Sequence, residues 1–152
     1  MLAEAKEELK RADHLLYVTL KYTRTADVIK NTIHRLLNSI DNAIISSLEI
    51  LKKKKKLKEI PLTPVSRAEL LSKLYNKAEM KQFLDFYFLL RKIDKAEFYK
   101  REEYRKHVAL IVEYGDEVIQ VDTETLEEYY IKTKQFVEFV ELKKELIKEN
   151  YR

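Results

Sequence analysis

Hydrophobic residues recur every three or four positions along most of this 152-residue chain, which is the spacing of one face of an α-helix. A first helix is predicted over residues 2–22. Its apolar face consists of Leu2, Ala5, Leu9, Ala12, Leu16 and Leu20. A longer second helix is predicted after Thr25, because a threonine can cap the first turn and Asp27 then lies where the helix dipole favours an anion.

The second helix carries a nearly unbroken apolar seam, which predicts packing against a neighbouring helix, either within the chain or across a dimer. The seam consists of Ala26, Ile29, Ile33, Leu36, Ile40, Ala43, Ser47 and Leu51. The sequence KKKKKLK at 52–58 ends this helix, and Pro61 and Pro64 then break helical geometry. A third helix is predicted to begin at Ser66, because Ser66 and Glu69 have the spacing of a capping box.

Two further helices are expected before the pattern changes. Residues 80–93, which contain FLDFYFLL, are the most apolar, so we expect them at the centre of the core with Asp85 as the one awkward side chain. Residues 96–107 follow as a more polar helix. A last helix begins at residues 122–123, where either Asp122 or Thr123 can provide the cap.

The period changes between residues 108 and 121. Residues 108–114 are β-branched and aliphatic, residues 117–121 alternate, and Gly115-Asp116 between them is a two-residue hairpin link. The alternative is a helix over residues 96–112 followed by a loop, and the hairpin is the favoured interpretation. The sequence therefore predicts a mainly α protein: an up-and-down bundle of about five to six helices in one domain (1–152), with one short β-hairpin near 108–121.

Composition excludes several classes of site. The chain has no cysteine, so it has neither disulfides nor thiolate metal sites, and a reducing cytoplasm is the simplest location. With a single glycine it has no Gly-rich phosphate loop. His14, His34 and His107 lack the close helical spacing of a metal motif, so we expect neither a metal nor a cofactor.

The remaining composition points to a well-solvated helical protein. Charged residues make up 37% of the chain, with Lys and Glu dominant, as in heat-adapted proteins. The sequence opens on the amphipathic LAEAKEELK rather than on a signal peptide, and the longest apolar run has five residues, so we expect no membrane segment. A net charge of +4 permits an anionic partner without requiring one.

One lysine run forms a candidate nucleic-acid contact. It consists of Lys52, Lys53, Lys54, Lys55 and Lys56, with Lys58 beyond. Such a run can neutralise several phosphates, and its affinity then falls steeply with salt. The alternative is that these cations complement the dipole at the end of a helix and keep that end soluble.

The sequence KREEYRKH at 100–107 is the candidate reactive site. Arg101 and His107 can bind a phosphate and move a proton, respectively, which suits RNA cleavage. On an unbroken helix they do not share a face, whereas Glu103 and Tyr104 lie three or four residues before His107 and can orient it. Arg105 shares a face with Arg101. The alternative is a solvated helix face without chemistry.

The spacing from Arg101 to His107 resembles the HEPN superfamily, small helical bundles with an Arg, four to six residues and then a His before the final helix. The two long N-terminal helices and VDTETLEEYY after the motif match that layout. The resemblance implies a homodimer whose two motifs face each other. It also implies a metal-independent endoribonuclease of a toxin–antitoxin type, paired with a nucleotidyltransferase antitoxin, although many relatives only bind. Glu102 after Arg101, and the absence of Gly-Tyr after His107, depart from the family pattern.

The leading hypothesis is therefore a HEPN-like protein that binds or cleaves RNA. In it Arg101 clamps the phosphate and His107 is the general acid–base. The alternative hypothesis is a non-catalytic helical module for dimerisation or protein interaction.

Overall fold

The computed structural model of the chain describes residues 1–150, with side chains described up to residue 144. The helices are α1 (Leu2–His14), α2 (Leu20–Tyr22), α3 (Ala26–Lys53), α4 (Pro64–Leu74), α5 (Ala78–Lys95) and α6 (Thr123–Asn150), and one π-helical turn, η1 (Leu15–Thr19), joins α1 to α2. The strands are β1 (Phe98–Arg101), β2 (Ala109–Tyr114) and β3 (Glu117–Asp122). The predicted mainly α fold with a short hairpin is confirmed.

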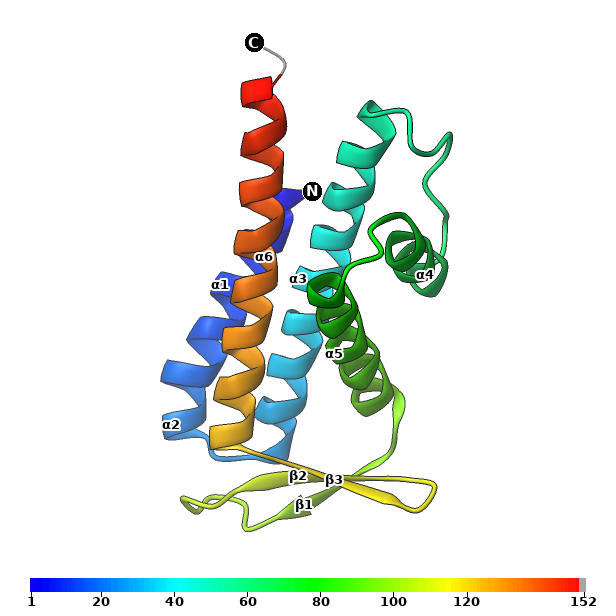
Figure 1. The fold of residues 1–152 in the computed structure, drawn as a ribbon. Coiled ribbons are helices and arrows are strands. Elements are labelled where there is room, and N and C mark those ends of the chain that lie inside the picture. The colour runs from blue at the N-terminus through cyan, green and yellow to red at the C-terminus, as the bar shows by residue number, and fades with distance from the viewer. Residues whose placement is uncertain (151–152) are drawn as a thin grey trace.

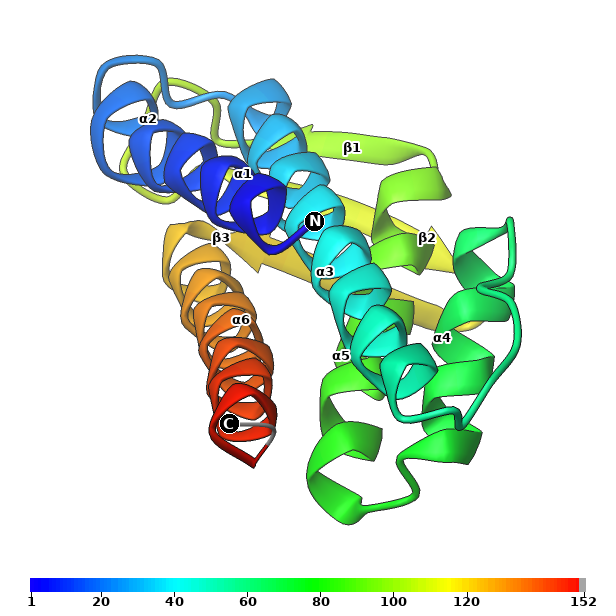
Figure 2. The same cartoon turned by 90° about the horizontal axis from the view of Figure 1, so that it is seen from above.

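The helices form a bundle that a small sheet closes at one end (Figure 1). Helices α1 and α5 run toward the sheet, and α3 and α6 run away from it. Seen from above, α3 lies between the pair α1 and α6 and the pair α4 and α5 (Figure 2). No helix in the described part of the chain is long and apolar enough to cross a membrane.

Helix α3 occupies the centre of the core. Its seam is buried within the chain, with Ile29, Ile33 and Leu36 completely inaccessible to solvent, so no second copy is needed to cover it. The expectation that residues 80–93 lie at the centre is wrong. Helix α5 packs its apolar face against α3 and, through Phe83 and Phe86, against α6. Its other face is left to solvent, and Asp85 lies on that exposed face.

Side-chain caps define the starts of α3 and α6. The Thr25 hydroxyl oxygen accepts a hydrogen bond from the Val28 N–H at 3.2 Å, as predicted. Asp122 Oδ1 accepts one from the Thr125 N–H at 2.8 Å, so Asp122 provides the predicted cap of α6.

The start of α4 differs from the predicted one. Thr63 is the cap, its hydroxyl oxygen accepting from the Ser66 N–H at 3.3 Å, and Pro64 is the first helical residue. A proline at that position removes only an N–H that would have no helical partner, and its fixed φ suits a helix. The predictions that Pro64 breaks the helix and that Ser66 caps it were therefore wrong.

The sheet is antiparallel in the order β1-β2-β3. Strands β2 and β3 form the predicted hairpin, and Gly115 at its turn has a φ of +61°. The predicted helix over residues 96–107 is wrong: Phe98–Arg101 is an edge strand, and turns follow it. The reason is tertiary, because the backbone of β1 pairs with β2 and Phe98 packs against the core.

The two faces of the sheet have different environments. Leu110, Val112 and Val121 belong to the core cluster and face the helices. Side chains alternate along a strand and directly paired residues share a face, so Arg101 and its partner Ala109 lie on the outer face, away from the bundle.

Candidate functional site

Arg101 and His107 lie at the two ends of the loop between β1 and β2. Arg101 is exposed on the outer face of the sheet, where its Nη1 donates a hydrogen bond to Gln120 Oε1 at 2.9 Å. His107 is exposed directly before the buried Val108. The residues between them form turns rather than a helix.

His107 lines a surface groove of about 560 Å³, and Arg101 is not among the residues that line it. The groove lies between η1 and α2, the loop at 102–107, and the first turns of α6. Its lining residues are Leu16, Tyr17, Leu20, Lys21, Arg24, Lys106, His107, Asp122, Thr123, Glu124 and Glu127.

Three cations share the groove with His107. Lys21 lies on α2, Arg24 lies in the short connection between α2 and α3, and Lys106 comes from the loop at 102–107. The guanidinium and ammonium groups can bind phosphate oxygens, and an imidazole can act as a general base or acid. Within one chain the arginine that shares the groove with His107 is therefore Arg24 rather than Arg101.

The loop is held against the start of α3 by the backbone. The Tyr104 N–H donates to the Arg24 carbonyl oxygen at 2.6 Å, and Glu102 and Tyr104 have φ values of +49° and +65°. Non-glycine residues rarely adopt this left-handed region, and such strain is kept where surrounding structure imposes it. The loop consequently presents His107 at the groove while Val108 anchors the chain in the core.

Tyr17 and Glu127 form a polar pair in the groove. The Tyr17 hydroxyl donates to Glu127 Oε1 at 3.3 Å, and its ring meets Tyr130 edge-on with the centroids 5.7 Å apart. Partial burial, and then the Glu127 carboxylate, raise the pKa of Tyr17. Its hydroxyl is therefore a neutral donor at physiological pH.

The other predicted catalytic residues lie outside the groove lining. The Glu103 carboxylate pairs with Lys100 Nζ at 3.6 Å, and Lys100 also contacts Asp27 at 3.5 Å. The Asp27 charge first, and then Glu103, raise the pKa of Lys100. Tyr104 is 77% exposed. Because these residues are not helical, the spacing argument that placed Glu103 and Tyr104 beside His107 does not hold.

The predicted nucleic-acid contacts are not together. Arg105 is exposed in the loop at the sheet end of the molecule, whereas Lys52 and Lys53 close the opposite end of α3 (Figure 1). All five lysines at 52–56 are exposed. Since α3 separates the two regions, they cannot contact one nucleotide.

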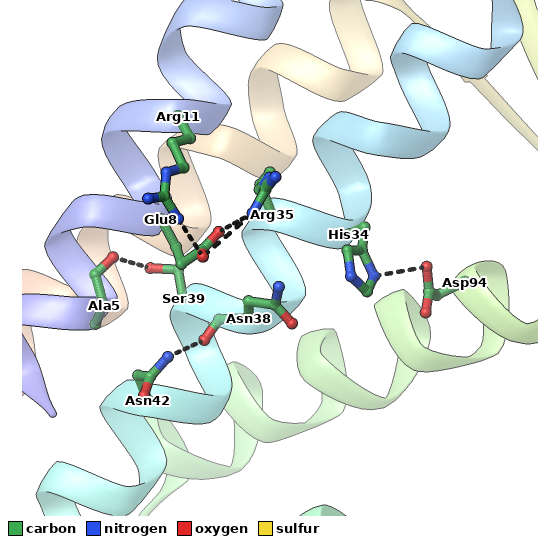
Figure 3. Close-up of polar contacts among 9 residues, drawn as sticks. All are labelled: Ala5, Glu8, Arg11, His34, Arg35, Asn38, Ser39, Asn42 and Asp94. Carbon is green, nitrogen blue, oxygen red and sulfur yellow. Dashed lines mark hydrogen bonds and ion pairs between the residues drawn. The ribbon is translucent and has the colours of Figure 1, made fainter.

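His34 and His14 are both exposed. His34 Nδ1 lies 3.6 Å from Asp94 Oδ1 on α5, whereas Arg35, on the side of α3 that faces α1, binds Glu8 (Figure 3). These contacts join α1 and α5 to the central helix. Among the described residues, no group of three or more His, Asp or Glu side chains is placed to hold a metal ion.

Sequence reasoning missed Tyr17, Lys21, Arg24, Lys106 and Glu127 as neighbours of His107. Each is an ordinary residue of a helix or loop, and up to about 110 positions separate the members of the groove, as for Tyr17 and Glu127. No local pattern therefore marks them. Comparison of the chain with protein-family models, curated proteins and solved structures found no match.

Proposed function

We propose that the chain binds single-stranded RNA in the His107 groove and cleaves it there without a metal ion. The observation that carries this proposal is the exposed imidazole of His107 in one groove with Lys21, Arg24 and Lys106. Imidazole near a cluster of cations suits an RNA phosphodiester, because the substrate needs both charge neutralisation and proton transfer.

In the proposed reaction, His107 takes the proton from a ribose 2′-hydroxyl. The 2′-oxygen forms a bond to phosphorus as the bond from phosphorus to the 5′-oxygen breaks. The same proton is then returned to the departing 5′-oxygen, giving a 2′,3′-cyclic phosphate and a 5′-hydroxyl. Arg24 and its neighbouring lysines stabilise the charge that grows on the phosphate oxygens.

The test is cleavage of a single-stranded RNA in EDTA. His107→Ala should lower kcat/KM by about 100-fold or more, and Arg24→Gln should raise KM as well as lower kcat. His34→Ala is the matched control, since His34 is also exposed but lies on α3 outside the groove. Equal cleavage by wild type and His107→Ala would exclude the proposal that this chain cleaves RNA through His107. Binding without cleavage would leave an RNA-binding module.

The HEPN resemblance adds a role for Arg101 that one chain does not provide. We propose that a second copy brings its Arg101 to the His107 groove of the first. Arg101 is exposed on the outer face of the sheet, which no helix of its own chain covers (Figure 1).

Mixing two inactive variants tests this arrangement. Arg101→Ala and His107→Ala, once mixed and allowed to exchange subunits, form mixed dimers with one site that contains both residues. About one quarter of wild-type activity should return, because half of the dimers are mixed and each has one complete site of two. No recovery in a mixture of dimers would show that Arg101 does not act across an interface.

A further inference from the structure

The groove carries opposite charges on its two sides, which binding of phosphate alone does not require. Lys21, Arg24 and Lys106 come from the side formed by α2 and the loop, which pass beside each other, whereas Glu124 and Glu127 come from α6 (Figure 2). Carboxylates repel RNA phosphates. The α6 side is therefore suited to a different part of the ligand, one that offers N–H donors.

Glu127 and Tyr17 are the pair best placed to bind such a group. The Tyr17 hydroxyl fixes Glu127 through Oε1 at 3.3 Å, while the edge-on contact with Tyr130 fixes the Tyr17 ring. The Tyr17 side chain remains about one-third exposed in the groove. An aromatic ring beside a carboxylate matches a nucleobase, since the ring stacks on the base and the carboxylate accepts from its edge.

Base chemistry decides which nucleotide this pair prefers. Guanine presents two adjacent donors on its Watson–Crick edge, N1–H and the N2 amino group, which match the two oxygens of a carboxylate. Adenine and cytosine present one amino group beside an acceptor nitrogen there. Uracil presents one N–H between two carbonyl oxygens. These oxygens repel a carboxylate that approaches the N–H, so uracil should bind less well than guanine.

We propose that the groove selects guanine, which stacks on Tyr17 and donates its N1–H and N2–H to Glu127. The phosphates next to that guanine then lie against Lys21, Arg24 and Lys106. This inference rests on the proposed RNA function and specifies the base that the same groove binds.

The experiment measures binding of fluorescent RNAs of roughly eight nucleotides by anisotropy. One is all uridine, and the others carry a single central G, A or C. Wild type should bind the RNA with one guanine about tenfold more tightly than the uridine RNA, the range of one bidentate pair. Glu127→Gln should abolish that preference and leave uridine RNA bound at least as tightly, because one repulsive charge is removed.

Glu128→Gln is the matched control, because Glu128 is the next residue of α6, is exposed, and lies outside the groove lining. It should keep the guanine preference. Equal wild-type affinity for all four RNAs overturns guanine selection and leaves the proposed RNA function standing. Equal weakening of every RNA by Glu127→Gln also overturns it. Failure of wild type to bind any of the RNAs at low salt overturns both proposals.

Discussion

The Asp41 carboxyl on α3 is half-buried and accepts a hydrogen bond from the Tyr87 hydroxyl on α5. Arg91 Nη1 lies 3.4 Å from the same hydroxyl oxygen and donates to it. Burial raises the pKa of Asp41, and the Tyr87 hydrogen bond and the Arg91 charge only partly oppose it. Burial, followed by the bond to Asp41, raises the pKa of Tyr87, which therefore remains a neutral donor.

Asp41 should make stability fall as pH rises. Its folded-state pKa lies above the ordinary 3.8, so the folded chain holds the proton more tightly than the unfolded chain. This contribution is complete below about pH 4 and is lost as pH rises through the folded-state pKa. The free energy of unfolding of wild type minus that of Asp41→Asn should therefore decrease between pH 4 and about pH 7.

Urea denaturation across this pH range provides the measurement. Asp85→Asn is the control, because Asp85 is an exposed residue of α5 and should show a nearly flat difference. A difference for Asp41→Asn that grows with pH would mean that pairing, rather than burial, dominates the Asp41 environment.

Tyr87→Phe should destabilise the protein by about 1–3 kcal/mol at pH 7, because it leaves the half-buried Asp41 carboxylate without its hydrogen-bond donor. The loss should shrink near pH 4, where Asp41 is protonated. Thermal unfolding at both pH values measures it, with Tyr22→Phe as the control, since Tyr22 is 86% exposed. Equal losses of stability at the two pH values would show that the contribution of Tyr87 does not depend on the ionisation of Asp41.

At the scale of elements, the β2–β3 turn depends on backbone conformation rather than space. Gly115 has a φ of +61°, and a Cβ at that position would meet no atom within 4 Å. Gly115→Ala should therefore lower the free energy of unfolding by about 1 kcal/mol through backbone strain alone. Gly115→Asn should cost less, because asparagine tolerates this region. Chemical denaturation of both variants distinguishes strain from steric contact, which would instead make asparagine the worse substitution.

Local signals predicted this turn, the Thr25 and Asp122 caps, and the apolar faces of α1 and α3, because each depends on residues within a few positions. Strand β1 had no such signal. It has four residues, and only its pairing with β2 makes it a strand, so its polar sequence was assigned to a helix. The helical assignment also placed Glu103 beside His107, which the loop does not.

In the candidate site, too, the sequence predicted what depends on local residues and missed what depends on tertiary contacts. The sequence identified His107 as a candidate, and the structure places it exposed in a groove. The sequence could not identify Arg24 and Tyr17 as its neighbours, because the fold of α2 and the β1–β2 loop brings them together. Arg101 is close to His107 in sequence, yet it does not line the groove: it ends β1, and the loop at 102–107 separates it from His107.

At the scale of the whole molecule, α3 fixes the distance between the two basic regions. It has 28 residues, which correspond to about 42 Å at the rise of an α-helix. The His107 groove lies near the start of α3, because Arg24 of the groove lining lies just before that helix. The lysine run at 52–56 lies at its other end (Figure 1). At about 3.4 Å per stacked nucleotide, an RNA must exceed about twelve nucleotides to reach both.

The lysine run should therefore matter only for long RNA. Replacing the five lysines at 52–56 by glutamine should weaken binding of an RNA longer than about twelve nucleotides and reduce its salt slope by up to about 3.5, the value for five phosphate contacts on a single strand. Cleavage of an RNA of roughly five nucleotides should be unchanged, because it fills only the groove. Replacing the same lysines by arginine keeps the charge and serves as the control. A loss with the short RNA would place the run in folding or in the groove itself, whereas unchanged binding of long RNA would assign these cations to the solubility of the α3 terminus alone.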